Sequence, residues 1–258
     1  MTKTLDDFEC VRIGDATLYL GDCLEIMPLL KAGSVDMVLA DPPYGTTQCK
    51  WDAIIPFKPM WAALKHLTVE RAAVVMTATQ PFTSALVSSN YRDFRYTWVW
   101  DKVKGTGFLN AKKMPMRNHE DVVVFYRKLP KYNPQKTTGH PRKTTYRGAH
   151  LQTDVYGDMK QDYKYSSTER YPRSVQVFST DTQSSSFHPT QKPIAMLEYM
   201  LATYSDEADT VLDFTMGSGS TGVACYHMRN KFIGIEKEEK YFDVACKRIR
   251  DAYANAVN

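Results

Sequence analysis

The chain has 258 residues, which suits one large α/β domain or one domain that carries a sizeable insertion. Its 33 basic and 29 acidic residues give a formal net charge of +4, so overall charge is a weak pointer to nucleic acid. The five cysteines are scattered and form no C-x-x-C pair, which argues against a disulfide framework and a zinc site. We therefore expect a cytoplasmic protein with reduced thiols and metal-free chemistry. We expect neither a signal peptide nor a membrane span, because no segment approaches roughly 20 consecutive apolar residues.

The first half of the chain alternates helical and strand patterns. Residues 11–20 predict a hairpin with Gly14 and Asp15 at its turn, and residues 23–30 predict a short amphipathic helix. The elements expected next are a buried strand at 35–40, a helix at 61–67, a buried strand at 72–76, a strand at 94–100, a polar loop around Arg117, Asn118 and His119, and a strand at 121–126. Helix alternating with buried strand is typical of a doubly wound sheet. No long helix separates the last two strands, so we expect them to form an antiparallel edge.

The composition changes over residues 127–186, which are polar and poor in aliphatic periodicity. Between Arg127 and Arg173 there are 11 basic and 4 acidic residues, a balance of +7. We predict an insertion here that divides one domain into the parts 1–126 and 187–258. Tyrosines lie among these charges and suit stacking on nucleic acid, with phosphates neutralised by basic side chains; a solvated insertion with ordinary charges is the alternative. The residues chosen for DNA contact are Lys136, Arg142, Lys143 and Arg147.

The last part of the chain returns to alternating helix and strand. Pro193 stands where a helix would begin, and the apolar face of residues 194–204 supports that helix. The elements that follow are a strand at 211–212, a helix at 221–228, a strand at 232–235 and a helix at 238–254.

The tetrapeptide Asp-Pro-Pro-Tyr at 41–44 stands directly after the predicted strand 35–40. Asp41 and the carbonyl of Pro42 can accept hydrogen bonds from an exocyclic amino group, and Tyr44 offers a flat face for the base that carries it. Ligands of open α/β sheets bind at the carboxyl ends of strands, which is where this loop lies. A chance turn is the alternative.

A second motif, D-F-T-M-G-S-G-S-T-G, runs from 213 to 222 between a predicted strand and helix. Its glycines allow close approach of backbone to ligand, and Glu236, at the tip of the next strand, can accept hydrogen bonds from ribose hydroxyls. By itself this motif also fits a nicotinamide or flavin Rossmann unit, or a tight turn. The Asp-Pro-Pro-Tyr loop favours amine methylation, because a dehydrogenase has no use for acceptors arranged around an amine.

Both motifs, in this order, resemble the beta group of amino DNA methyltransferases that use S-adenosylmethionine. The run H-P-T-Q-K-P at 188–193 resembles the segment that opens the helix before the cofactor strand in that family. The resemblance spans nearly the whole chain and implies a circularly permuted, Rossmann-like, doubly wound mixed sheet with a small target-recognition insertion. It also implies that the strands ending at Ala40 and Leu212 lie side by side.

The resemblance assigns site residues. Asp41, Pro42 and Tyr44 would be catalytic, and the cofactor would contact Asp22, Asp213, Phe214, Gly217, Ser218, Gly219, Glu236 and Lys192. A turn-forming Gly-Asp is the rival explanation for Asp22. The family commonly has Pro-Phe after the aspartate of the glycine loop, whereas this chain has Phe214 and Thr215. In the loop 45–52 Lys50 would touch phosphate, although Trp51 could equally anchor the loop to the domain.

The expected function is methyl transfer to adenine N6 of a base flipped out of double-stranded DNA, since Asp at the first motif position is the commoner choice for adenine in this family. Cytosine N4, RNA, a noncatalytic DNA-binding role and a nicotinamide oxidoreductase are the alternatives. Family members often dimerise, so a homodimer is an alternative to a monomer. The sequence does not decide whether a restriction enzyme accompanies this protein. The resemblance implies a bacterial, archaeal or phage-encoded cytoplasmic enzyme.

Overall fold

The computed structural model describes residues 3–46, 52–147, 152–153, 157–158, 162–179 and 192–254. The chain forms two compact units, one from Met1–Asn133 with Ser174–Asn258 and the other from Pro134–Arg173. In the described part of the chain, no helix is both long and apolar enough to cross a membrane.

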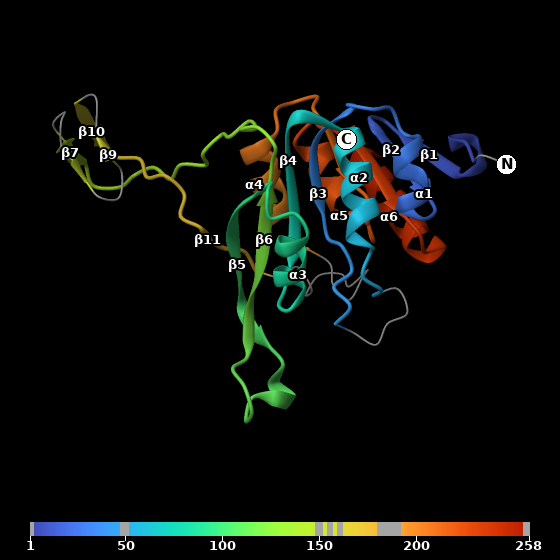
Figure 1. The fold of residues 1–258 in the computed structure, drawn as a ribbon, viewed down its shortest axis with the longest axis horizontal. Coiled ribbons are helices and arrows are strands. Elements are labelled where there is room, and N and C mark those ends of the chain that lie inside the picture. Colours follow the sequence, from blue (N-terminus) through green and yellow to red (C-terminus); the bar gives the residue numbers. More distant parts are fainter. Residues whose placement is uncertain are drawn as a thin grey trace. The chain divides into compact units, whose positions relative to one another are not determined.

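The larger unit is built on a nine-stranded sheet in the order β1-β2-β13-β12-β3-β4-β6-β5-β11 (Figure 1). The strands are β1 Glu9–Ile13, β2 Ala16–Leu20, β3 Val35–Ala40, β4 Thr68–Ala78, β5 Phe94–Thr106, β6 Arg117–Phe125, β11 Val175–Val177, β12 Thr210–Asp213 and β13 Lys231–Glu236. Strands β2, β13, β12, β3 and β4 are parallel, whereas β6 is antiparallel to both β4 and β5. The predicted doubly wound mixed sheet and the antiparallel pairing of β5 with β6 are therefore confirmed, although the edge strand itself is β11, which is parallel to β5.

Helices cover both faces of this sheet and bury two hydrophobic cores. The helices are α1 Cys23–Ile26, α2 Phe57–Leu67, α3 Phe82–Ser89, α4 Ile194–Tyr204, α5 Ser220–His227 and α6 Glu239–Ala254. Side chains of α1, α2 and α3 pack on one face, and those of α4, α5 and α6 on the other. Strand β3 serves both cores, because successive side chains of a strand point to opposite faces: Met37 and Leu39 face one core, Val38 and Ala40 the other.

The permuted arrangement predicted from the motif order is present. Strands β12 and β3 are parallel neighbours, with Val211 opposite Met37 and Leu212 opposite Val38. Parallel neighbours end at the same edge of the sheet. Asp41 and Asp213 therefore both lie at this edge, although 172 residues separate them along the chain.

Three local predictions were wrong or incomplete. Residues 117–119 belong to β6 rather than to a loop, because pairing with β5 satisfies their backbone. The helix predicted at 23–30 ends at Ile26 and continues as a 3₁₀ turn, Met27–Leu29, since Pro28 has no amide hydrogen to donate. Helix α3 was missed, because the apolar run that forms it is short and follows Pro81.

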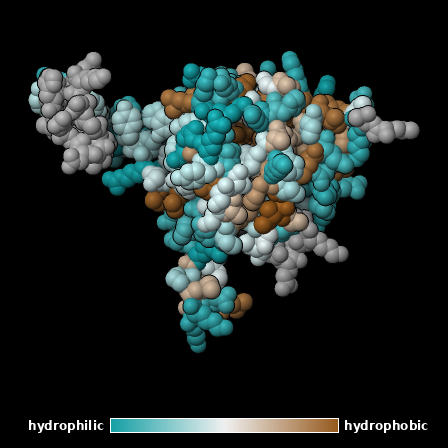
Figure 2. All heavy atoms as spheres, viewed as in Figure 1, coloured by the Kyte–Doolittle hydropathy of each residue, from teal (hydrophilic) through white to brown (hydrophobic). Residues whose placement is uncertain are grey.

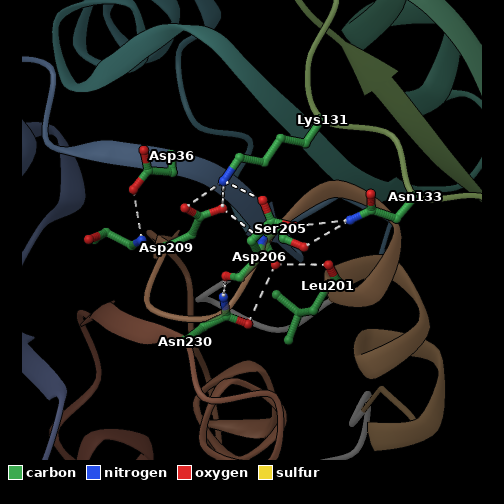
Figure 3. Close-up of polar contacts among 9 residues, drawn as sticks. Asp36, Lys131, Asn133, Leu201, Ser205, Asp206, Asp209 and Asn230 are labelled. Atoms are coloured by element: carbon green, nitrogen blue, oxygen red, sulfur yellow. Dashed lines mark hydrogen bonds and ion pairs between the residues drawn. The ribbon is translucent and has the colours of Figure 1, made fainter.

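The segment that leads to the smaller unit is anchored to the turn after α4 (Figure 3). The ammonium of Lys131 lies 2.7 Å from Oδ2 of Asp209 and 2.9 Å from Oδ2 of Asp206. The backbone amide of Asn133 donates to the carbonyl of Thr203 at 2.8 Å. These contacts fix the chain within the larger unit immediately before residue 134.

Within the smaller unit, β7 Lys143–Arg147 and β10 Tyr163–Ser167 form an antiparallel pair, and so do β8 Gln152–Thr153 and β9 Gly157–Asp158. Thr137 and Arg170 exchange backbone hydrogen bonds. Short strand pairs of this kind have little core of their own.

Candidate active site at the carboxyl ends of the central strands

Asp41 is held by three donors directly after β3. Its Oδ1 accepts from the hydroxyls of Tyr44, at 2.7 Å, and Thr77, at 2.5 Å. Its Oδ2 accepts from the ammonium of Lys192 at 2.6 Å. Thr77 is on β4, next to β3 in the sheet. The predicted catalytic carboxylate is therefore oriented by side chains from three separate segments, of which the sequence had not indicated the one that carries Thr77.

Lys192 belongs to this carboxylate cluster. Its side chain is 7% exposed, and its ammonium lies 3.6 Å from Oε2 of Glu120 as well as against Asp41. Burial acts to lower the pKa of Lys192, but the charges of Asp41 and Glu120 outweigh burial and raise it. Lys192 is therefore a permanent cation at neutral pH. Of the motif at 188–193, residues 188–191 lie outside the described residues.

Glu120 connects Lys192 to the base of the β5–β6 hairpin. Its side chain is 12% exposed, and Oε1 pairs with the ammonium of Lys102, whose side chain is exposed to the same extent. Lys102 in turn lies over the ring of Trp100, 5.2 Å from its centroid. The contact of Glu120 with Lys192 makes it part of the site, and only the pairing of β6 with β5 and β4 reveals this.

Tyr44 is partly buried, and its ring stacks on Phe82 of α3 with centroids 5.2 Å apart and an interplanar angle of 29°. Burial, followed by the charges of Asp41 and Glu120, raises the pKa of Tyr44 well above its ordinary value, so the hydroxyl keeps its proton. It can therefore act as a donor to Asp41. Stacking of a base on Tyr44 stays a prediction.

The glycine loop follows β12 and is organised around Asp213. This carboxylate is 2% exposed and accepts from the Thr221 hydroxyl at 2.7 Å and the Thr215 amide at 3.1 Å. Burial, together with the charges of Asp41 and Glu236, raises the pKa of Asp213 to about 7, although the hydrogen bonds from Thr221 and Thr215 act to lower it. Three carboxylates thus act on one another at this edge, an environment that favours a cation such as a sulfonium.

Glu236 closes the loop from the end of β13. Oε2 accepts from the Gly217 amide at 2.8 Å, and Oε1 accepts from the amides of Lys237 and Glu238 at 2.8 and 2.9 Å. A carboxylate has about four acceptor sites, so these three bonds leave one for a ligand hydroxyl. Burial raises the pKa of Glu236.

Other residues assigned to the cofactor have structural partners. Asp22 caps α1, accepting from the Leu24 amide at 2.9 Å, and its other oxygen lies 3.2 Å from the ammonium of Lys237. Phe214 is 1% exposed within the core beside α1, α2 and α3. The carbonyl and hydroxyl oxygens of Ser218 both accept from Arg248. Contact of these three residues with the cofactor stays a prediction.

The two glycines of the loop have different surroundings. Both have left-handed backbone, with φ of +52° at Gly217 and +77° at Gly219. A Cβ at Gly217 would meet nothing within 4 Å, whereas a Cβ at Gly219 would lie 2.9 Å from Cβ of Ala245 on α6. Gly217 therefore borders space that a ligand can enter, which fits the close approach of a nucleoside cofactor, and Gly219 allows α6 to pack.

Alanine at these two glycines should separate cofactor binding from folding. Both substitutions introduce left-handed strain of about 1–2 kcal/mol, but only Gly219→Ala adds a clash of about 1–3 kcal/mol. We expect Gly219→Ala to have the lower free energy of unfolding in urea titrations. Gly217→Ala should weaken S-adenosylmethionine binding about tenfold or more in calorimetric titrations, as overpacking of 1–3 kcal/mol would do. Equal effects of the two variants on both quantities would contradict these assignments.

The predicted DNA-contact residues are only partly described. Lys50 and Trp51 lie outside the described residues. In the smaller unit, Lys136 pairs with Glu169 at 2.8 Å, and Arg142 lies 3.4 Å from the Ser166 hydroxyl. Lys143 is the exposed first residue of β7, and the backbone of Arg147 ends that strand.

Comparison with known proteins identifies the family. Residues 35–247 match the model of a family described as DNA methylase, whose members methylate at N6 or N4. The type II methyltransferase M.HinfI of Haemophilus influenzae is 26% identical over 264 residues, which cover 93% of this chain and 69% of that protein. M.HpaI of Haemophilus parainfluenzae is 24% identical over 255 residues, which cover 91% of this chain and 74% of that protein.

Solved structures share the fold. The M1.HpyAVI–SAM complex matches with a TM-score of 0.61 at 22% identity, over 91% of this chain and 98% of that chain. The cytosine-N4-specific PvuII DNA methyltransferase matches with a TM-score of 0.65 at 14% identity, over 94% and 93%. Because the family model spans well over half of the sequence and contains both motifs, the chain belongs to the N6/N4 DNA methylases and is an S-adenosylmethionine-dependent amino DNA methyltransferase.

Proposed function

We propose that this enzyme methylates N6 of an adenine that is flipped out of duplex DNA. The observation that carries the proposal is the carboxylate of Asp41, which is oriented by Tyr44, Thr77 and Lys192. It lies at the same edge of the sheet as the start of the glycine loop 213–222. Extrusion of the base costs a few kcal/mol and brings its amino group to the loop. A serine at the position of Asp41 would favour cytosine, according to the family resemblance.

The hydrogen-bond capacity of Asp41 suits one amino hydrogen. Of about four acceptor sites on a carboxylate, Tyr44, Thr77 and Lys192 take three, which leaves one. The carbonyl of Pro42 would accept the second amino hydrogen. Together these acceptors draw the nitrogen lone pair out of conjugation with the ring and aim it away from the loop.

S-adenosylmethionine supplies a methyl group on a sulfonium, which is already a good leaving group. This chain therefore has to position the nitrogen and stabilise charge rather than form a covalent bond to the substrate. Asp213 and Glu236 favour the cationic cofactor at the glycine loop. Asp41 accepts the proton that the methylated nitrogen releases. The ammonium of Lys192, 2.6 Å from Oδ2, orients Asp41 for this task.

Nucleoside analysis tests this function. Purified protein is incubated with unmethylated duplex DNA and methyl-labelled S-adenosylmethionine, and the DNA is digested to nucleosides. Label in N6-methyl-deoxyadenosine is expected. Label in N4-methyl-deoxycytidine would overturn the base assignment and keep the mechanism, whereas label only with an RNA substrate, or cofactor binding without any transfer, would overturn the function.

We also propose that residues 127–186 are the target-recognition insertion and that 1–126 and 187–258 form one catalytic domain. The basic excess of the insertion supports this proposal. The relatives are bacterial type II methyltransferases, which supports a cytoplasmic modification enzyme of bacterial type. Homodimerisation is a further proposal, tested below.

Removal of three positive charges from the smaller unit should weaken DNA binding. Lys136, Arg142 and Lys143 are exposed, and each phosphate contact contributes about 0.9 to the slope of log K against log salt. In fluorescence anisotropy with duplex DNA, the triple alanine variant should lower affinity and reduce the slope by up to about 3. A triple variant of the exposed Lys31, Lys240 and Lys247 is the matched control. Equal slopes for the two variants would mean that the insertion has another role.

A further inference from the structure

The β5–β6 hairpin extends beyond the carboxyl end of the sheet. Ala78, the last residue of β4, is opposite Asp121, which is itself opposite Val99 on β5. Both hairpin strands continue past this point, as far as the pair Thr106 and Arg117. Figure 1 shows the hairpin leaving the body of the larger unit. At about 3.3 Å per residue, the β6 arm from Asp121 to Arg117 reaches roughly 13 Å beyond this point, and residues 107–116 form the tip beyond it.

The projecting part is apolar and basic, and its side chains are largely exposed among the described residues. Residues 103–119 are all exposed. Phe108 is 78% and Leu109 97% exposed at the tip, and Val103, Met114 and Met116 are exposed beside them. Over residues 103–118 there are four basic residues and no acidic one: Lys104, Lys112, Lys113 and Arg117. Figure 2 shows apolar and hydrophilic side chains together on this projection.

The tip nevertheless has a defined backbone. Gly107 has a φ of +90° and begins the 3₁₀ turn Phe108–Asn110. Amides of Lys113 and Met114 donate to the Asn110 carbonyl at 2.8 and 3.0 Å. The tip therefore presents two apolar side chains on an ordered backbone. Exposed apolar patches on monomeric proteins commonly mark binding sites.

The base of the hairpin is joined to the catalytic carboxylate. Lys102 on β5 pairs with Glu120 on β6, Glu120 with Lys192, and Lys192 with Asp41. This chain of charges places the hairpin beside the loop that would receive the base. A substrate held at Asp41 would therefore have its flanking duplex near the basic projection.

We propose that the hairpin tip is a DNA wedge: Phe108 and Leu109 enter the base stack where the target base has left it, and Lys104, Lys112, Lys113 and Arg117 contact neighbouring phosphates. The proposal rests on the proposed function, because it concerns how that enzyme extrudes its base. Apolar wedges that unstack a base step are an established way of deforming DNA. The absence of acidic residues from 103–118 favours duplex DNA over a protein surface of mixed charge.

The wedge variant Phe108→Ala/Leu109→Ala tests this role. The methylation site is first mapped by sequencing a plasmid that the wild type has methylated. On a duplex that contains this site, the single-turnover rate of the variant should be about 10- to 100-fold lower than that of the wild type. A mismatch opposite the target base lowers the cost of extrusion, so on that duplex the variant should return to within about threefold of wild type. Thermal midpoint and cofactor affinity should not change, because both side chains are exposed.

Matched controls separate the wedge from a general surface effect. Tyr91 is 77% exposed in the turn before β5, at the opposite end of that strand, so Tyr91→Ala should behave as wild type. Lys112→Ala/Lys113→Ala should weaken binding to the matched and mismatched duplexes equally and reduce the salt slope by up to about 2.

The outcomes distinguish the two proposals. The wedge alone is overturned if the wild type labels DNA and the wedge variant has an unchanged rate. It is also overturned if the rate of the wedge variant falls but the mismatch does not restore it. A wild type that labels no DNA overturns both proposals. If sedimentation shows a wild-type dimer that the wedge variant dissociates, with full methylation by the monomer, the tip is an interface between copies of this chain and the wedge is wrong.

Discussion

Replacing Asp41 by alanine is expected to lower kcat for methyl transfer by about 10²- to 10³-fold. The substitution removes an acceptor that is aimed at the reacting amino group, and loss of one preorganised polar contact typically costs 10²–10³-fold. It also leaves Lys192 with Glu120, 3.6 Å away, as its remaining carboxylate partner among those described. Cofactor affinity should change only a few-fold, because Asp213 and Glu236 keep their own hydrogen bonds.

Single-turnover rates at saturating cofactor, together with calorimetric titration of S-adenosylmethionine, measure both effects. Asp41→Asn is the conservative variant, since it keeps the shape of the side chain and removes its charge. Glu70→Gln is the control, because Glu70 is an exposed carboxylate near the other end of β4. An Asp41→Ala enzyme that retains more than a tenth of wild-type kcat would rule out the acceptor role.

Replacing Lys192 by methionine is expected to destabilise the protein and to lower kcat. The pair is largely buried, with side-chain exposures of 7% for Lys192 and 27% for Asp41. Removal of one partner leaves the other charge poorly compensated, which costs about 3–5 kcal/mol in fully buried pairs. Because Asp41 keeps some solvent, we expect a loss of about 2 kcal/mol in the free energy of unfolding, within the range of strongly felt single substitutions.

A double-mutant cycle with Asp41→Asn isolates this interaction. Asp41→Asn/Lys192→Met should lose less stability than the two single variants together, because neither charge is then left alone. Lys131→Met is the matched control: Lys131 is 45% exposed, so its pairs with Asp206 and Asp209 should contribute about 1 kcal/mol or less (Figure 3). Urea titrations that give additive effects would show that Lys192 and Asp41 act independently.

Lys192 also illustrates the difference between a motif and a role. The resemblance placed it with the cofactor residues, because it lies in the run that precedes the cofactor strand. Its ammonium contacts the carboxylate of Asp41, and contact of Lys192 with the cofactor stays a prediction. Loss of kcat with unchanged cofactor affinity in Lys192→Met would support the role of Lys192 in positioning Asp41.

The sequence by itself determined the strand 35–40, the loop that follows it, the glycine loop at 213–222 and their order. Apolar runs, prolines and glycines act on the backbone within a few residues, so these elements can be predicted locally. Short pieces such as α3 escaped, because eight residues after a proline carry too little periodicity.

Only the tertiary structure decided which side chains complete the site. Thr77 and Lys192 are 36 and 151 residues from Asp41 in the chain. Thr77 meets it because β4 lies beside β3, and Lys192 because α4, which follows it, packs on the sheet. Glu120 reached the cluster because β6 lies beside β4, and the apolar hairpin tip was recognisable only once Phe108 and Leu109 were seen to be 78% and 97% exposed. Contacts between distant segments depend on how strands are ordered and how faces are buried, and a local pattern carries no record of either.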